Sequence, residues 1–466
     1  MTTLDDTTTA LDGSRYLTGA FAPVSDEVTA FDLEVLEGEI PTELTGRYLR
    51  NGPNPFSVSD AANYHWFTGS GMVHGIRLRA GKAEWYRNRW VRSPQLAAEM
   101  GEDAPENPTG DDQVFAANTN VIGHAGSTFA IVEAGSPPIE LSYELDTVRV
   151  SNLDGTLPKA FSAHPKRNPA TGDLHVAAYW WGWGNQMQYL VVGADGRVKT
   201  AVDVPLPGAP MIHDIAITEH WAVLFDLPCT FDLDIAMAGA QLPYRWHPEY
   251  GARLGLLPID GSGTAQWFEI EPCYVYHPLN AYERADGVVV LDAVRHPSMF
   301  ATDVNGPNEG AATLDRWTLD PATGSVTSSR LDDRSQEFPR HDERLLGRRH
   351  RFGYGVGFET SAELSRPEVS VAIKHDVDAG TSEVHDYGQG RSTGELVFVP
   401  SSDEAVEDDG WLMSLVHDAG TDRSELVILH SQDFTGSPVA RVALPQRVPV
   451  GFHGNWIPDA DPAWGP

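Results

Sequence analysis

Four of the seventeen histidines in this chain of 466 residues occur in strand-like, mostly apolar segments that lie far apart in the sequence. Neutral imidazole is a ligand for iron, copper, zinc and nickel, so four convergent rings would form an all-nitrogen metal centre. Zinc sites are usually closed tetrahedra or three-ligand catalytic sites, often with cysteine or carboxylate ligands. Four histidines without a carboxylate ligand leave Fe(II) its full charge and open positions for dioxygen, which favours redox chemistry over hydrolysis. The four are His164 in FSAHPK, His213 in MIHDIAIT, His277 in YVYHPLNAYE and His453 in VPVGFHGNW.

Three glutamates have the surroundings expected of residues that orient such histidines: Glu133 in AIVEAGSPP, Glu337 in SQEFPR and Glu395 in TGELVFVP. Each context is partly apolar, so an unpaired carboxylate there would be costly to bury. A metal-bound histidine needs a partner for its second ring nitrogen, usually a carboxylate, which fixes the tautomer. Taken singly, a buried glutamate is more often a turn or salt-bridge residue, and a lone histidine more often belongs to the core or surface. The other histidines, including the close pair His65 and His74, are interpreted as structural.

No local turn could bring these seven residues together, so they must be placed by a closed, repeating fold. The last five, from His213 to His453, follow one another at intervals of 64, 60, 58 and 58 residues, whereas the two earlier intervals, counted from Glu133, are 31 and 49 residues. A repeat near 60 exceeds the roughly 40–50 residues of common propeller blades and fits four strands with generous loops. The spacing predicts a β-propeller of seven blades, each projecting one residue toward a central axis.

Short alternating or β-branched runs recur along almost the whole chain, among them GSTFAIVE, DLHVAAYWW, HWAVLFDL, DGVVVLDAV and SELVILHS. Turn sequences such as ADGR, DGSG and PATG separate these runs, and 44 glycines and 33 prolines supply further turns. The best amphipathic helix covers about residues 93–102. Residues 1–15, rich in threonine and aspartate, predict a disordered tail, and residues 16–466 predict a single all-β propeller domain because no linker divides them.

The chain is strongly acidic, with 33 lysines and arginines against 66 aspartates and glutamates and a formal net charge of −33. Such a surface repels nucleic acid and anionic lipid headgroups, which argues against a nucleic-acid partner. Two cysteines are too few for a disulfide framework. The N-terminal sequence lacks the basic and apolar regions of a signal peptide, and no apolar run approaches the roughly 18 residues of a membrane span. We expect a cytoplasmic protein without a transmembrane segment; transient membrane contact and the oligomeric state stay open.

Longer motifs, in the same order along nearly the whole chain, resemble the carotenoid cleavage oxygenase family. They are GRYLRNGPNP, HWFTGSGMVHG, ANTNVIGHAG, VEAGSPPIEL, FSAHPKRNPATGDL, MIHDIAITEHWAVLFDLP, HPLNAYE, EFPR, GELVFVPSSD and GFHGNW. The resemblance implies a seven-bladed β-propeller, capped by loops and short helices, with Fe(II) on its axis.

The resemblance also implies roles for single residues. It makes His164, His213, His277 and His453 the iron ligands. It places one carboxylate behind three of them, with Glu133 holding His213, Glu337 holding His277 and Glu395 holding His453. Glu283, in NAYE, also matches and is interpreted as structural.

The implied reaction is scission of one C=C bond by O2, which yields two carbonyl products without an external reductant. Relatives that cleave hydroxylated stilbenes typically carry a lysine directly before the first of the three glutamates and a tyrosine upstream, which together grip the phenol. Here the corresponding positions are Val132 and, in EDAPENP, Pro105. We therefore expect an apolar alkene, a carotenoid or apocarotenoid, reaching the iron through an apolar tunnel. Residues 180–185, WWGWGN, either contribute to that tunnel or belong to the core.

Three alternatives stay open at this point. A stilbene- or phenylpropene-cleaving dioxygenase would use the same iron site. A retinoid isomerohydrolase would use it without O2, but that branch is attached to membranes and this chain has no basic amphipathic segment. A binding propeller without catalysis would not need four histidines in these contexts.

Overall fold

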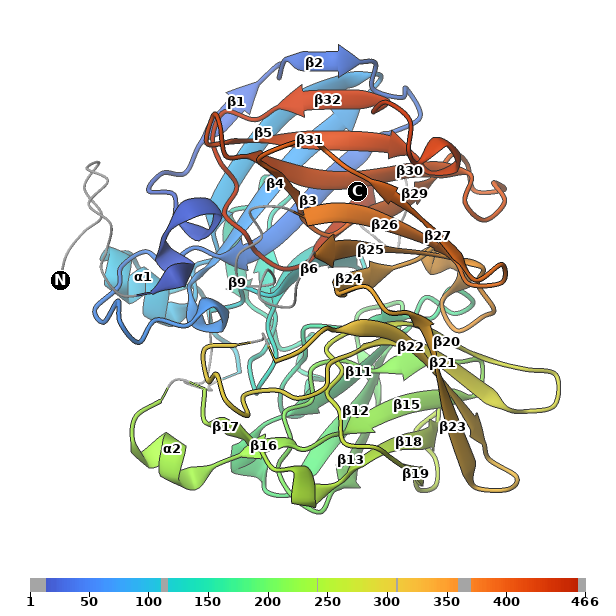
Figure 1. Ribbon diagram of the computed structural model, residues 1–466. Coiled ribbons are helices and arrows are strands. Elements are labelled where there is room, and N and C mark those ends of the chain that lie inside the picture. The colour runs from blue at the N-terminus through green and yellow to red at the C-terminus, as the bar shows by residue number, and fades with distance from the viewer. Residues whose placement is uncertain (1–13, 110–115, 241, 307–308, 359–369, 460–466) are drawn as a thin grey trace.

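The computed structural model describes residues 14–109, 116–240, 242–306, 309–358 and 370–459. Within these ranges the chain forms seven antiparallel sheets of four to six strands, arranged as the blades of a propeller (Figure 1). The prediction of an all-β, seven-bladed propeller is confirmed. Residues 1–13 of the expected tail lie outside the described residues, and the first 3₁₀ helix, η1 (Arg15–Leu17), begins at the tail's last residue.

The second to sixth sheets follow one another along the chain, each starting with its innermost strand. The second sheet is β6 (Asn120–His124), β7 (Ser127–Ile131), β8 (Ile139–Leu141) and β9 (Thr147–Val150). The third is β10 (Lys166–Arg167), β11 (Leu174–Tyr179), β12 (Gln186–Val192) and β13 (Val198–Pro205). The fourth is β14 (Ala216–Ile217), β15 (Trp221–Asp226), β18 (Ala252–Pro258) and β19 (Gln266–Ile270). The fifth is β20 (Pro278–Glu283), β21 (Val289–Arg295), β22 (Thr313–Asp320) and β23 (Ser325–Asp332), and the sixth is β24 (Gln336–Arg340), β25 (Phe352–Phe358), β26 (Ser370–Asp376) and β27 (Thr381–His385).

The first and seventh sheets combine segments from both ends of the described chain, which closes the ring. In the first, β33 (Gly454–Pro458) pairs with β3 (Gly46–Pro53), followed outward by β4 (Gly71–Arg79), β5 (Lys82–Trp90) and β1 (Thr29–Phe31). In the seventh, β28 (Arg391–Thr393) and β29 (Val397–Pro400) both pair with β30 (Gly410–Asp418), followed by β31 (Arg423–His430), β32 (Ala440–Ala443) and β2 (Val35–Gly38). Closure of this kind leaves no long unpaired inner edge.

Helices are few and short among the described residues, and α1 and α2 lie on the same side of the molecule, at the left of Figure 1. The predicted helix is α1 (Pro94–Met100), which Ser93 caps by accepting a hydrogen bond from the Leu96 amide. It ends at Gly101, whose φ of 73° is the left-handed conformation that glycine adopts readily. Not expected was α2 (Leu233–Met237), which lies between the two strands of an extra hairpin, β16 (Cys229–Phe231) and β17 (Tyr244–Trp246).

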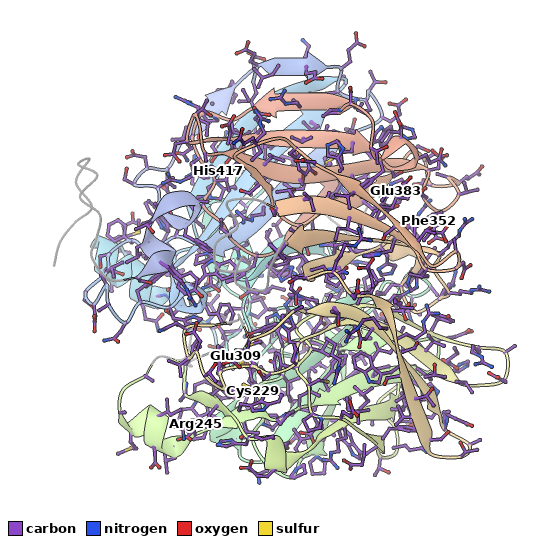
Figure 2. All side chains as sticks on the ribbon, viewed as in Figure 1. Cys229, Arg245, Glu309, Phe352, Glu383 and His417 are labelled. Atoms are coloured by element: carbon purple, nitrogen blue, oxygen red, sulfur yellow. The ribbon has the colours of Figure 1, made fainter. Side chains whose placement is uncertain are left out.

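Apolar side chains pack between neighbouring sheets, and Cys229 among them is fully buried. Arg245 and Glu383, labelled with Cys229 in Figure 2, are exposed. The largest cluster joins the third, fourth and fifth sheets and contains Tyr189 and Leu254, both without exposed surface. Because each sheet is packed on both faces, the inner strands are held at fixed positions around the axis. The residues just before or within these strands are therefore positioned rigidly.

Candidate metal centre

Four inner strands bring the predicted histidines together. His164, His213, His277 and His453 come shortly before β10, β14, β20 and β33, and all four are buried. One ring nitrogen from each lies within 4.8 Å of the others. The Nε2 atom of His213 lies 2.9 Å from that of His164 and 3.1 Å from that of His277. Residues separated by up to 289 positions thus converge on one point, as the sequence predicted.

Three of these rings are oriented by glutamates through their other nitrogen. Glu133 Oε2 lies 3.1 Å from His213 Nδ1, and Glu337 Oε2 lies 2.6 Å from His277 Nδ1. Glu395 Oε1 lies 2.9 Å from His453 Nδ1. A carboxylate only accepts, so each Nδ1 carries the proton and each Nε2 presents a lone pair to the centre of the cluster. These are the pairs that the family resemblance implies.

The donor set fits a metal ion. Several imidazole lone pairs directed at one another in a dry site repel unless a cation lies between them, and the buried Nε2 of His453 has no hydrogen-bond partner among the described residues. Burial, together with the neighbouring His213 and His453 rings, holds the pKa of His164 well below its ordinary value. Burial likewise lowers the pKa of His277 to about 3, against the opposing effect of Glu337. Neutral rings at physiological pH are the form that binds metal.

His213 differs from these two rings. Burial acts to lower the pKa of His213, but the adjacent Glu133 carboxylate and its hydrogen bond outweigh burial and raise the pKa above its ordinary value. The Glu133 carboxylate therefore stabilises positive charge at this ring.

The second oxygens of two glutamates contact residues that the sequence did not single out. Glu337 Oε1 lies 2.7 Å from His296 Nε2. Glu395 Oε2 accepts from Arg340 Nη1 at 2.9 Å and from the Gly454 amide at 2.9 Å. Burial would raise the pKa of Glu395, but Arg340 first and His453 next lower it to about 2, and the two histidines around Glu337 likewise lower the pKa of that carboxyl.

Sequence reasoning interpreted His296 as an ordinary core histidine and did not consider Arg340. The position of Arg340 inside the EFPR motif, three residues after Glu337, was the available signal. Glu283, interpreted as structural, accepts hydrogen bonds from Thr218 and His220 at the far end of β20. His65 and His74 are also apart from the cluster, since His65 caps η3 (Trp66–Thr68) and His74 Nδ1 pairs with the Tyr86 hydroxyl.

An apolar cavity of about 590 Å³ reaches the cluster on one side, with Glu133 and His213 in its wall. The rest of its wall is mostly aromatic and aliphatic, and α2 forms part of it. Trp180 and Trp181, from the tryptophan-rich segment, belong to this wall, and Trp181 stacks on Phe231 with ring centroids 4.7 Å apart. Further lining residues are Phe67, Thr119, Val132, Tyr179, Met211, Leu233, Met237, Tyr244 and Phe452.

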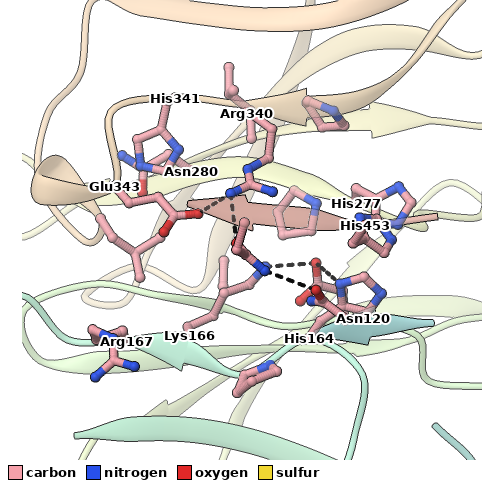
Figure 3. A pocket seen from close by; sticks show the side chains of 18 of the residues that line it. Asn120, His164, Lys166, Arg167, His277, Asn280, Arg340, His341, Glu343 and His453 are labelled. Carbon is pink, nitrogen blue, oxygen red and sulfur yellow. Dashed lines mark hydrogen bonds and ion pairs between the residues drawn. The ribbon is translucent and has the colours of Figure 1, made fainter. Parts of the chain in front are cut away.

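A smaller pocket of about 250 Å³ reaches the cluster from a different set of residues, and we call it the polar channel after the charged and amide side chains that line part of it. Figure 3 shows His277 and His453 beside each other in this channel, with Arg167 and His341 farther from them. Hydrogen bonds between inner strands cross it, since Asn455 Nδ2 donates to Asn120 Oδ1 at 3.0 Å. Other lining residues are His164, Lys166, Asp214, Asn280, Arg340, Glu343 and Glu395.

Comparison with known proteins shows which family shares this architecture. A family described as retinal pigment epithelial membrane protein matches residues 21–458. A carotenoid cleavage oxygenase of Mycobacterium tuberculosis is 45% identical over 494 aligned residues, which cover 95% of this chain and 97% of the relative. The chain belongs to the carotenoid cleavage oxygenase family. This member of the carotenoid cleavage oxygenases is therefore an enzyme, an oxidoreductase of the dioxygenase type.

Two solved structures resemble this chain over nearly its whole length. The lignostilbene dioxygenase of Pseudomonas brassicacearum superposes with a TM-score of 0.86 at 28% identity, covering 96% of this chain and 99% of the other. A cobalt-substituted oxygenase of Synechocystis superposes with a TM-score of 0.84 at 27% identity, covering 94% and 97%. The isoeugenol monooxygenase of Pseudomonas nitroreducens is 30% identical over 95% of this chain and 98% of its own length.

The longest described helix, α1, has seven residues, too few to cross a bilayer.

Proposed function

We propose that the protein is a non-haem Fe(II) dioxygenase that cleaves a C=C bond of a carotenoid or apocarotenoid with O2 to give two carbonyl products. The observation that supports this proposal is the position of the four-histidine cluster at the wall of a largely apolar cavity. A volume of about 590 Å³ lies within the range of pockets that enclose a small organic molecule. The relative from Mycobacterium tuberculosis, named a carotenoid cleavage oxygenase, agrees with this substrate class.

His164, His213, His277 and His453 would hold the iron through Nε2, with Glu133, Glu337 and Glu395 fixing three of the rings. Bound Fe(II) would supply the capacity to bind and activate O2. The protein's own contribution is positional: the aromatic wall formed by Tyr179, Trp180 and Phe231 would align an extended alkene and exclude water. The cavity therefore selects the substrate, and the histidines and glutamates prepare the metal.

Val132 supports an apolar substrate over a phenolic one. It belongs to the cavity wall directly beside Glu133, where a lysine would place a cation able to hold a phenolate. A buried substrate hydroxyl next to valine would lose its hydrogen bonds to water without replacement. Pro105, the second position that departs from the phenol-gripping pattern, is not among the described residues of this wall.

The second candidate is cleavage of a hydroxylated stilbene or phenylpropene. It is favoured by Tyr179 and Tyr244, two hydroxyl-bearing side chains in the cavity wall near Glu133. Burial, with the charge of Glu133 added, raises the pKa of both phenols, so both stay protonated and able to donate. The isoeugenol monooxygenase and lignostilbene dioxygenase relatives are named for substrates of this class.

The test is a product assay on protein loaded with Fe(II). An apocarotenal, a carotene, resveratrol and isoeugenol are supplied separately, and the aldehydes and O2 consumption are measured. We expect about one iron per chain and faster cleavage of the apocarotenal or carotene than of the phenolic alkenes. Preferential cleavage of resveratrol or isoeugenol would select the second candidate. Scission without O2 uptake, or wild-type rates in metal-free protein, would contradict both.

A further inference from the structure

His164 is supported differently from the other three histidines. Among the described residues no carboxylate lies within hydrogen-bonding distance of its Nδ1, and the one carboxylate oxygen within 4.0 Å is Asp214 Oδ2, at 3.8 Å. A metal-binding imidazole without a partner for Nδ1 can rotate and change tautomer, so we expect another group to hold His164 in place. Asp214 directly follows His213 in the chain.

The Asp214 carboxylate is held in place from two directions. Oδ1 accepts a hydrogen bond from the Ile215 amide at 2.6 Å, and Oδ2 accepts from Lys166 Nζ at 2.8 Å. Its side chain is 1% exposed, and that of His164 is 5% exposed. Charge-assisted contacts of this kind fix geometry as well as charge. Asp214 therefore presents a stationary negative charge to the Nδ1 face of His164.

The gap between the two groups opens onto the polar channel, because His164, Lys166 and Asp214 all belong to its wall. A separation of 3.8 Å is too long for a direct hydrogen bond, so the Asp214 carboxylate acts on His164 through its charge. A negative charge on this side of the ring favours the tautomer with the proton on Nδ1, which is the tautomer that the glutamates select elsewhere.

We propose that Asp214 is the carboxylate that positions His164, acting across the separation of 3.8 Å, and that the charge of Lys166 partly offsets the charge of Asp214. This inference rests on the proposed function, since it takes His164 as a metal ligand. The centre then has four carboxylates behind its four histidines. Among the described residues, Asp214 and Glu395 form ion pairs with Lys166 and Arg340, whereas the ion-pair partners of Glu133 and Glu337 are histidines. The carboxylates without a lysine or arginine partner would balance the charge of a bound cation.

Asp214 and Lys166 carry opposite charges, so substitutions of these two residues are expected to change metal affinity in different ways. Asp214→Asn removes a negative charge beside His164, so Co(II) affinity is expected to fall about tenfold. Lys166→Met leaves that negative charge uncompensated, so affinity is expected to equal or exceed that of the wild type. Co(II) affinity is measured by competition with a chelator, and the ligand-field absorption of bound Co(II) reports the orientation of the rings. We expect a shifted Co(II) spectrum in the Asp214→Asn protein.

Asp226 provides the matched control, because it is another fully buried carboxylate with a basic partner, Arg253 Nε at 2.6 Å, and it does not line the channel. Asp226→Asn should leave Co(II) affinity and spectrum unchanged. If the Asp214→Asn protein does not fold, the Asp214→Asn/Lys166→Met double variant, which leaves neither charge unpaired, carries the same expectation.

Two results would overturn the inference: wild-type affinity and spectrum without the Asp214 charge, or equal losses in the Asp214→Asn and Lys166→Met proteins, which would mark a packing pair only. His164→Ala distinguishes this failure from a failure of the proposed function. If His164→Ala binds Co(II) as the wild type does, then the proposed ligand set is wrong. If His164→Ala loses the metal while Asp214→Asn keeps it, the ligand set stands and only the role of Asp214 is wrong.

Discussion

The apolar cavity and the polar channel reach the cluster through different histidines, since His213 lines the cavity whereas His164, His277 and His453 line the channel. The cavity wall holds one carboxylate, Glu133, among aromatic and aliphatic side chains, whereas the channel wall holds Lys166, Asp214, Arg340 and Glu343. Side chains that would recognise an apolar substrate are thus separated from most of the ion pairs that orient the histidines. We therefore expect substitutions in the cavity wall to change substrate choice and substitutions in the channel wall to change metal binding.

The greatest loss is expected from removing a histidine of the cluster, because each of the four lines one of the two regions. His213→Ala, from the cavity wall, and His164→Ala, from the channel wall, should each reduce bound iron to below about one-tenth per chain and abolish turnover, because three imidazoles hold the ion less tightly. Metal analysis of the purified proteins, beside circular dichroism to verify folding, checks this. Retention of iron in only one of the two proteins would show that the centre does not use both walls equally.

The next effect is a loss of iron affinity, expected when either of two glutamates is replaced. Glu133→Gln and Glu395→Gln should each weaken iron affinity roughly 10–100-fold. Glu395→Gln should in addition lower the free energy of unfolding by about 1.5–3 kcal/mol, because the Arg340 guanidinium loses one of its two carboxylate partners and keeps only Glu343. Glu133→Gln should not, since among the described residues its salt-bridge contact is His213 alone. Metal titration and urea denaturation of both proteins measure the two quantities. Equal stability of the two variants would contradict the assignment of Arg340.

A cation in the cavity should affect turnover and not metal binding. Val132→Lys places a charge in the apolar wall, so turnover of an apocarotenal should fall at least about tenfold while iron content stays at the wild-type level. Val132→Leu is the apolar control. Arg344→Gln changes a charge at the channel wall, where the guanidinium pairs with Asp342, and should leave turnover within about twofold. If the two charge changes reduced turnover equally, the separation of the regions would be refuted.

The change that involves the two regions least is a pH dependence common to all variants, from four buried histidines that line neither region. Burial lowers the pKa of His65 to about 3 and those of His124, His175 and His375 to about 4. The unfolded chain takes up protons near pH 6.5 that the native protein refuses, so stability is fully present above pH 6.5 and decreases as the pH falls toward 4. Urea denaturation of metal-free protein between pH 4.5 and 7.5 should show this slope, and His175→Gln should reduce it. A flat profile would contradict the buried neutral state.

The all-β propeller could be predicted from the sequence because short β-branched runs, turn residues and spacing are local properties of the chain. The seven central residues were singled out by their apolar contexts and by the resemblance of their motifs to the family, and their roles at a metal stay a prediction. The short interval between Glu133 and His164 has a structural reason: Glu133 follows the second strand of its sheet, β7, whereas the other six residues lie in, beside or shortly before inner strands. His296 and Arg340 were not predicted, because their contacts arise only when neighbouring sheets pack. The hairpin that carries α2 was missed since its helix has only five residues.

The closure of the ring has a consequence for the order in which the enzyme matures. His453 directly precedes β33, and β33 reaches its place only by pairing with β3, about 400 residues earlier in the chain. A nascent or partly unfolded chain that lacks this pairing does not have His453 in place beside the other three histidines. Tight binding of a metal ion by all four rings would therefore require completed folding, and chains in which the two ends have not met would hold the ion less tightly.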